Sequence, residues 1–456
     1  MSKVRDIKDD ILILDEYLQD PQHTTHSSAD IAKALKSIHS EDEELFNDYL
    51  KKIPNDCLGD IALELPEKHL KDIIEELPKQ DLVEVIEELD SDDAADLLQD
   101  IEDIDKQKAE QILSSMDEDD QNEIKKLKSY DEHQAGAYMQ TELFWANLDE
   151  KIKESIKKLK ELKEKEGLDD THNVFVVGTF NKLMFTIPFE DLIIADFDTT
   201  YRDFVKGRED DFKSIYVKDD DDIQDVVKLF KEHDLSVVPV VNYHGELLGR
   251  ITSDDIYDVM QESATEQIYN LAGVDDEAEE DEDFFVAGKK RAWWLFINLL
   301  TAILASAVIG LFDDTISSYV ALAVLMPIVA SMGGNAGTQA LTVTVRKLAL
   351  GDIDDKNKKE AIKREVLMSI LNGLLFALIL GVIASLWFKN SMLGVVIGLS
   401  MIINLLAAGF FGAMIPLLLK RLNIDPAVGS TVILTTVTDV VGFFSFLGLA
   451  SLLLIK

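Results

Sequence analysis

The chain has 456 residues, with 86 acidic side chains against 45 basic ones and a formal net charge of −41. The acidic excess lies in residues 1–291, which hold 77 acids and 34 bases, whereas residues 292–456 are nearly neutral and hold five long apolar runs. A region with this excess of negative charge would repel the phosphates of nucleic acid, which argues against a nucleic-acid partner. The eight scattered His residues and the lone Cys57 form no catalytic constellation, so no enzyme is expected.

The N-terminal part gives few local signals. Residues Met1 to Asp6 run directly into charge, so no signal peptide is expected, and Cys57 excludes an internal disulfide and fits a reducing cytoplasm. Within residues 1–49, an N-terminal extension, a helix is predicted at about 4–19. The carboxylates of the acidic region have two interpretations, a solubilising surface or a surface for hard cations such as Mg²⁺, which take oxygen ligands and water.

Residues 50–135 are predicted to form a small superhelix of short helices, because residues 50–128 repeat with a period of 12. At each period an apolar residue is followed by Pro or an acid, which marks the start of an amphipathic helix. The pairs in this phase are Ile53-Pro54, Leu65-Pro66, Leu77-Pro78, Leu89-Asp90 and Ile101-Glu102. Asp92 and Asp96 share one helix face, where two acids repel each other unless they are solvated or bound to a metal ion.

Residues 136–201 and 202–272 are each predicted to form a strand–helix–strand–strand–helix unit, and the first copy matches less well. Thr252 to Asp255 would cap the last helix of the second unit. The strands are predicted at Val174–Gly178, Leu183–Ile187, Ser214–Lys218, Ser236–Val241 and Leu247–Ile251, and a helix is predicted at Ile223–His233.

Residues 273–291 are predicted to link these units to five membrane spans, each long enough to cross a ~30 Å hydrocarbon core. Lys and Arg cluster before the first span, between the second and third, and between the fourth and fifth. This bias predicts a cytoplasmic N-terminus and a C-terminus outside. The spans are predicted at 292–312, 318–345, 366–388, 392–419 and 427–454.

Polar residues interrupt the second and fifth spans. Asp439 lies in the middle of the fifth span, and because no Lys, Arg or His lies in the same run, a cation is its expected partner. The second span holds Pro327 and the glycine-rich stretch Gly333–Gln339. Small and polar residues at this depth indicate either helix packing or a wet path, and their combination with Asp439 favours a pore. Asn372 and Asn404 are interpreted as polar contacts between helices.

These features together resemble the MgtE family of magnesium transporters over nearly all of the chain after residue 50. The paired units look like CBS domains, which alone would be a weak mark. The specific marks are Gly333-Gly334-Asn335-Ala336-Gly337-Thr338-Gln339, Val345-Arg346-Lys347-Leu348-Ala349, Asp425-Pro426-Ala427 and Thr436-Val437-Thr438-Asp439-Val440-Val441-Gly442. The resemblance implies a multi-domain integral membrane protein with an all-α superhelical N domain, α/β tandem CBS domains and an α-helical five-span transmembrane domain.

The resemblance further implies a homodimeric Mg²⁺ channel in the cytoplasmic membrane, with its pore on the two-fold axis. Asp439 would be the pore acid, and the backbone carbonyl of Thr435 would help to hold a largely hydrated ion. The further positions that the resemblance places along the pore are Asn335, Gly334, Gln339 and Gly442.

Carboxylates between the soluble domains would sense cytoplasmic Mg²⁺ and close the pore. The positions that match the family's sensor acids are Asp92, Asp96, Asp222, Asp234, Asp255, Asp258, Glu266 and Asp425. Gln224, Ser263 and Gln267 stand where the family has acids, and the neighbouring Asp225 and Glu262 are expected to substitute.

Two further expectations follow from the resemblance. The second part of residues 273–291 would be a connecting helix that blocks the closed pore, whereas its acidic half, Asp275–Asp283, is either part of that connection or a solvated linker. Thr252 and Asp255 match the ribose position of nucleotide-binding CBS domains, which makes ATP a candidate modulator, although a helix cap explains the same two residues.

Two alternatives to a channel stay open at this point. One is a proton- or Na⁺-coupled carrier for Mg²⁺, Co²⁺ or another divalent cation, and the other is a membrane-anchored Mg²⁺ or nucleotide sensor that conducts nothing. The chain contains no Walker-type glycine loop, so the membrane potential would drive a passive channel, at about 2.3 kcal/mol per charge per 100 mV.

Overall fold

The computed structural model describes residues 7–165, 168, 171–272, 284–353, 356–422 and 424–455. The chain divides into two compact units, residues 1–261 and residues 262–456, which are described separately. The acidic half of the predicted linker, residues 273–283, lies outside the described residues.

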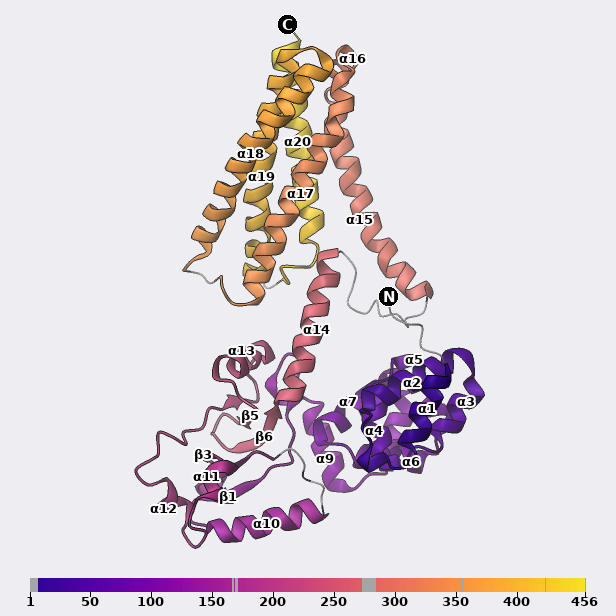
Figure 1. The fold of residues 1–456 in the computed structure, drawn as a ribbon, viewed down its shortest axis with the longest axis vertical. Coiled ribbons are helices and arrows are strands. Elements are labelled where there is room, and N and C mark those ends of the chain that lie inside the picture. Colours follow the sequence, from indigo (N-terminus) through magenta and orange to yellow (C-terminus); the bar gives the residue numbers. More distant parts are fainter. Residues whose placement is uncertain are drawn as a thin grey trace. The chain divides into compact units, whose positions relative to one another are not determined.

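Unit 1 begins with a stack of short helices (Figure 1). Pro54, Pro66 and Pro78 each occupy the position before a helix, as the period of 12 predicts. Each helix buries one apolar face and exposes acids on the other. The helices are α1 (Ile7–Tyr17), α2 (Ser28–Glu41), α3 (Glu43–Leu50), α4 (Asn55–Leu63), α5 (Glu67–Glu76), α6 (Lys79–Glu87), α7 (Ser91–Ile104), α8 (Lys106–Leu113) and α9 (Glu118–Leu127).

Two predicted boundaries in this stack are wrong. Leu14, Ile31 and Phe46 are fully buried in the same core as the helices after residue 50, so α1 to α3 are not a separate extension. The predicted helix start at Ile101-Glu102 lies inside α7, which continues to Ile104; no Pro follows Ile101 to interrupt the helix. The next helix starts instead after Asp105, whose side chain accepts hydrogen bonds from the backbone of Gln107 and Lys108.

Two small sheets complete unit 1, and both have the predicted order. In each, a first strand pairs parallel with a second, which pairs antiparallel with a third, and a register shift falls at the same place in both copies. The elements are β1 (Trp145–Asn147), α10 (Ile152–Lys165), β2 (Asn173–Val177), β3 (Leu183–Pro188), α11 (Phe189–Ile193), α12 (Tyr201–Val205), β4 (Val217–Lys218), α13 (Ile223–His233), β5 (Val237–Val241), β6 (Leu247–Thr252) and α14 (Ser253–Ala272). The second sheet shares its core with the helical stack, whereas the first has a core of its own.

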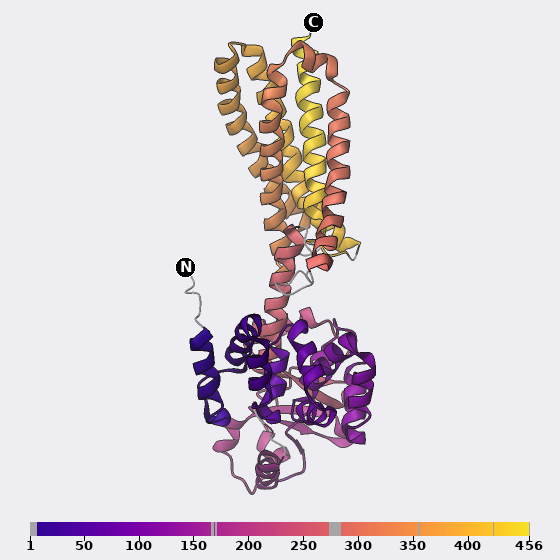
Figure 2. The same ribbon diagram turned by 90° about the vertical axis from the view of Figure 1, so that its right-hand side faces the viewer.

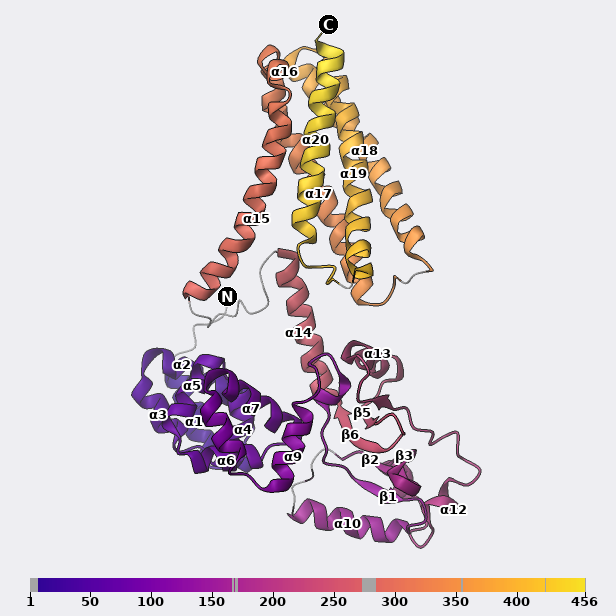
Figure 3. The same ribbon diagram turned by 180° about the vertical axis from the view of Figure 1, so that it is seen from behind.

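Among the described residues of unit 2, five helices are long and apolar enough to cross a membrane, as predicted. In order they are α15 (Phe284–Gly310), α17 (Ala321–Ala349), α18 (Lys358–Phe388), α19 (Ser391–Arg421) and α20 (Ser430–Leu454), with the short α16 (Asp313–Ser318) after α15. They lie side by side (Figure 2). The α19 helix is the most buried of the five and packs against α17, α18 and α20, while α15 contacts α20 (Figure 3).

The second part of residues 273–291 is helical, as predicted, but it is not a separate connecting helix; the end of α14, before this segment, is what packs against the membrane helices. Residues 284–291 form the start of α15 and continue into the first span without a break. The end of α14 belongs to unit 2, where Leu271 packs against Leu341, Val345 and Leu434. The hydroxyl of Thr431 on α20 also donates to the Leu271 carbonyl at 2.8 Å.

Candidate ion-binding sites

Asp439 lies near the middle of α20, where it is half-buried. Within the described part of the chain, no side chain forms a hydrogen bond or an ion pair with its carboxylate. No other Asp or Glu lies in the five spans predicted from the sequence. A lone carboxylate at this depth is the feature of unit 2 that most needs a cation or water as a partner.

The α17 helix exposes a polar face along the same part of unit 2. Asn335 and Gln339 lie on it, and the Asn335 side chain donates to the Ser331 hydroxyl at 3.4 Å. A methyl group at Gly334 would meet open space. The exposed polar residues of this face are Ser331, Asn335, Thr338, Gln339 and Thr342. Their spacing follows the helical period, so they form one continuous strip.

Asp439 and this polar strip lie at similar depths. The α17 and α20 helices run antiparallel, because Gly337 contacts Leu434 while Gly333 and Gly442 both contact Asn404 on α19. Gly333 on α17 and Gly442 on α20 mark the level of Asn404. From that level toward the contact between Gly337 and Leu434, Asn335 lies two residues from Gly333 and Asp439 lies three residues from Gly442. With a rise of about 1.5 Å per residue, the two residues match in depth to within about one helical turn of 5.4 Å.

Two of the predicted pore positions have other contacts. Gly442 is buried against the Asn404 side chain, so within one chain it serves helix packing and lies on no open surface. The carbonyl of Thr435 accepts a hydrogen bond from the Thr438 hydroxyl at 3.1 Å. Within one chain, the Thr435 carbonyl and Gly442 are thus engaged in contacts inside the helix bundle, whereas Asn335, Gly334 and Gln339 lie on an open face.

A second cluster of carboxylates lies within unit 1. Asp92, in the first turn of α7, is only 4% exposed, and its Oδ1 has no hydrogen-bond partner among the described residues. Burial raises the pKa of Asp92 well above its usual value, and the charges of Asp255 and Asp93 raise it further. The sequence left Asp92 open to a solvated-surface interpretation, which its burial contradicts.

The pKa values of further acids in this cluster are also raised. Burial, followed by the charge of Asp255, raises the pKa of Asp93 to about 7. Burial also raises the pKa of Asp255 to about 6, although the Thr252 hydroxyl donates to its carboxylate at 2.7 Å. Glu64, the residue directly after α4, has a raised pKa through burial and the charge of Asp258. Sequence analysis did not select Asp93 or Glu64, and only the fold brings Asp93 close to Asp255 and Glu64 close to Asp258.

These shifts predict that unit 1 loses stability as the pH rises. The folded-state pKa values of Asp93 and Asp255 are raised, so their contribution is fully present below the unfolded value of 3.8 and is lost as the pH passes about 6 to 7. We expect Asp93→Asn to flatten this loss in calorimetric scans of the Mg²⁺-free full-length protein. The exposed Asp220→Asn is the matched control, and an equal effect of both substitutions would contradict the assignment.

The remaining predicted sensor acids of unit 1 are exposed and scattered. Asp96 and Asp258 are exposed on α7 and α14. Asp222 caps α13 by accepting from the Gln224 backbone at 2.8 Å, and Asp234 ends the same helix with a positive φ of 50°. Asp225, expected to substitute for Gln224, pairs with Lys228 at 2.7 Å. The structure therefore brings Asp92 and Asp255 together but leaves Asp222 and Asp234 at opposite ends of α13.

Two predicted sensor acids meet within unit 2. The Asn270 side chain near the end of α14 donates to Asp425 at 3.0 Å and to Glu266 at 3.4 Å. Asp425 also accepts from the Ala427 backbone at 2.8 Å, which fixes the turn before α20. Sequence analysis missed Asn270, because nothing local indicates that it bridges two acids, one of which lies 155 residues away.

Across the described residues, no three His, Cys, Asp or Glu side chains are placed so that they could hold one metal ion. The carboxylate clusters have the oxygen chemistry that Mg²⁺ prefers. Any ion held by one or two of these carboxylates would keep several of its water molecules, as Mg²⁺ usually does in proteins.

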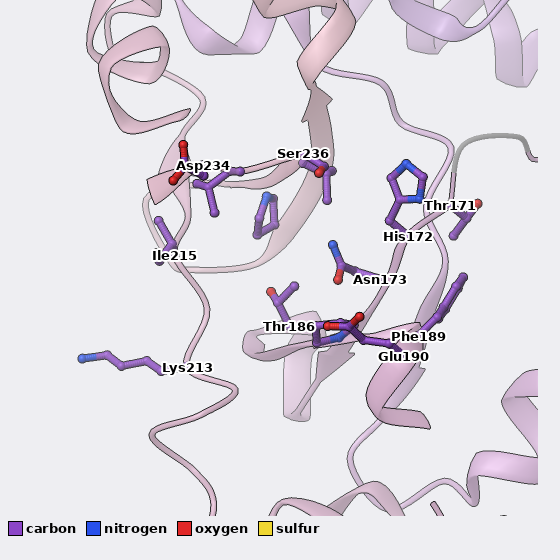
Figure 4. A pocket seen from close by; sticks show the side chains of 14 residues that line it. Thr171, His172, Asn173, Thr186, Phe189, Glu190, Lys213, Ile215, Asp234 and Ser236 are labelled. Atoms are coloured by element: carbon purple, nitrogen blue, oxygen red, sulfur yellow. The ribbon is translucent and has the colours of Figure 1, made fainter. Parts of the chain in front are cut away.

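A cavity of about 630 Å³ lies within unit 1, between its two small sheets (Figure 4). His172, Asn173 and Thr186 line it on the side of the first sheet, and Asp234 and Ser236 line it on the side of the second. The Lys213 side chain extends outward at its edge. Thr252 and Asp255, the predicted nucleotide residues, do not line this cavity. The Asp255 carboxylate accepts from the Thr252 backbone at 3.2 Å, which is a helix-cap contact, and from the Thr252 hydroxyl at 2.7 Å.

Known proteins resemble the chain along most of its length. The magnesium transporter MgtE of Enterococcus faecalis is 34% identical over 73% of this chain and 72% of its own. The chain belongs to the MgtE family. The family model described as a divalent cation transporter matches residues 326–449, the MgtE intracellular N domain matches residues 26–133, and a CBS domain matches residues 210–262.

The chain is also similar to a second curated relative and to a solved structure. The magnesium transporter MgtE of Thermus thermophilus is 31% identical over 73% of this chain and 72% of its own. The crystal structure of the cytosolic domain of the Mg²⁺ channel MgtE in complex with ATP is 25% identical, covers 54% of this chain and 99% of that chain, and has a TM-score of 0.45. The MgtE N-domain match begins at residue 26, which agrees with the placement of α2 and α3 in the helical core.

Proposed function

We propose that this chain transports Mg²⁺ across the cytoplasmic membrane as a homodimeric channel. The observation that carries the proposal is Asp439, a lone carboxylate in the middle of a membrane helix of an MgtE-family chain. Oxygen ligands from Asp439 and from the amides of the α17 polar strip suit a divalent cation that keeps most of its water. The basic loops favour a cytoplasmic N-terminus and an outside C-terminus.

The exposed polar strip of α17 supports the homodimer. Asn335 and Gln339 would face lipid if one chain stood alone, and unsatisfied polar groups in hydrocarbon cost several kcal/mol each. A second copy related by a two-fold axis would cover this strip and present the same residues twice around one path. Two Asp439 carboxylates then face one ion, which a single acid would hold poorly.

Gating by cytoplasmic Mg²⁺ follows from the carboxylate clusters. Asp92, Asp93 and Asp255 repel one another when ionised, so Mg²⁺ would favour the arrangement that brings them together. The bridge from Glu266 through Asn270 to Asp425 joins the end of α14 to the turn before α20. This connection gives the sensor a physical route to the helix that carries Asp439.

The proposal is tested by Mg²⁺ uptake into proteoliposomes that hold the full-length protein under an imposed voltage. We expect uptake that depends on the voltage, ignores pH and Na⁺ gradients, and falls when Mg²⁺ is raised on the soluble-domain side. Uptake that requires a pH or Na⁺ gradient would favour the coupled carrier. No uptake under any condition would favour the non-conducting sensor.

We place a modulating nucleotide such as ATP in the cavity between the two sheet units. Its volume lies within the range of about 300–1,000 Å³ that is usual for ligand pockets. The Lys213 side chain extends outward at the cavity edge and would turn inward to meet a phosphate, past the acids Asp234 and Glu190 of the same lining. Asp255, in contrast, lies among other acids. We expect Lys213→Ala to weaken ATP binding in calorimetric titrations several-fold more than Asp255→Ala. The reverse order would return the nucleotide to Thr252 and Asp255.

A further inference from the structure

Asn404 is a buried polar side chain at the centre of the membrane domain. It lies in the middle of α19 and is 0% exposed. Its Nδ2 donates to the Val329 carbonyl of α17 at 2.8 Å. Its Oδ1 has no hydrogen-bond partner within the described residues. A buried amide that leaves one polar atom unsatisfied lowers stability, so its place among apolar helices needs a reason beyond packing.

Two glycines on other helices make room for this amide. A methyl group at Gly333 on α17 would lie 2.8 Å from the Asn404 Cγ, and one at Gly442 on α20 would lie 2.8 Å from its Nδ2. Both distances are too short for a carbon atom. The Asn404 side chain therefore occupies a three-helix node, defined by Gly333, Asn404 and Gly442, that no larger residue than glycine can share.

We propose that Asn404 is a positioning residue for the ion path, an inference that rests on the proposed function. The node sets the level of α17 against α20: Asn335 lies two residues after Gly333 on α17, and Asp439 lies three residues before Gly442 on the antiparallel α20. The hydrogen bond to the Val329 carbonyl holds one level of α17, because the next carbonyl of that helix lies about 1.5 Å further along the axis and about 100° around it, so sliding α17 would break the bond. Asn404 thereby keeps the polar strip and the Asp439 carboxylate at matching depth.

The first test is Mg²⁺ uptake by Asn404→Ala in proteoliposomes. We expect the Mg²⁺ concentration at half-maximal uptake to rise several-fold, because the ion would meet Asp439 and Asn335 at mismatched depths. A residue that only helps the protein to fold would lower the maximal uptake per reconstituted protein and leave the half-maximal concentration unchanged. An unchanged half-maximal concentration would therefore overturn the inference.

The second test is a suppressor experiment on the node. Gly442→Ala should lower uptake several-fold because its methyl group meets Asn404, and adding Asn404→Ala should recover much of that loss by removing the obstructing amide. Gly337→Ala is the matched control, since its methyl group would meet Leu434 at 3.1 Å and Asn404→Ala cannot relieve that contact.

The outcomes separate this inference from the proposed function. If wild-type uptake is present and Asp439→Ala abolishes it, but Asn404→Ala rescues Gly337→Ala as well as Gly442→Ala, the positioning role is wrong and the channel stands. Simple additivity of the losses in Asn404→Ala and Gly442→Ala would also overturn it. Absence of wild-type uptake would overturn both.

Discussion

Asp439→Ala is expected to reduce Mg²⁺ uptake by about a hundredfold or more. At an effective dielectric constant of about 20, removing one carboxylate about 5 Å from a divalent ion costs several kcal/mol of attraction before solvent compensates for part of it. A remaining loss of about 3 kcal/mol corresponds to about two orders of magnitude in rate. The measurement is voltage-driven uptake into proteoliposomes, normalised to reconstituted protein.

The controls for Asp439 separate charge from shape. Asp439→Asn keeps the size of the side chain and removes its charge, so we expect a loss close to that of Asp439→Ala, whereas Asp439→Glu should retain part of the uptake. Ser445→Ala is the matched neighbour, because Ser445 is half-buried on the same helix and donates only to the Gly442 carbonyl. Near-normal uptake in Asp439→Asn would show that the charge is not what the ion recognises.

Local patterns were sufficient to predict most of the fold. The period of 12 located the starts of α4, α5 and α6, because Pro is unfavourable in the interior of a short soluble helix and favourable at its start, where Pro54, Pro66 and Pro78 are the N-caps. Hydropathy located all five spans, because a helix that crosses a bilayer must be apolar over about 20 residues. The same local logic failed at α7, where Leu89-Asp90 and Ile101-Glu102 look alike but only the first begins a helix.

The candidate sites were less predictable, because burial depends on which distant segment packs nearby. Asp92 and Asp96 share one face of α7 in the sequence, yet Asp92 is buried and Asp96 is exposed. Gly442 lies in a membrane motif that suits a pore or a packing contact equally, and only Asn404 on α19 decides between them. Asn270 carries no local signal at all, since its partner Asp425 lies far along the chain.

The second large effect is expected at Asp92. Asp92→Asn keeps the shape of the side chain and removes a buried negative charge that has no compensating base, so the Mg²⁺-free protein should become more stable. At pH 8 we expect the melting temperature of the soluble region to rise by about 2–4 °C for each kcal/mol of repulsion removed. Adding Mg²⁺ should then raise the melting temperature of Asp92→Asn by less than that of the wild type, because the ion has less repulsion to relieve.

The same substitution should make uptake independent of the cytoplasmic Mg²⁺ concentration. If ionised carboxylates hold the sensor apart at low Mg²⁺, their neutralisation favours the compact arrangement without the ion, and the ratio of uptake at low and high Mg²⁺ should approach one. Asp96→Asn, one turn further along α7 and exposed, is the matched control and should retain most of the regulation. A lower Mg²⁺-free melting temperature in Asp92→Asn, with full Mg²⁺ regulation retained, would mean that this charge stabilises the fold and takes no part in sensing.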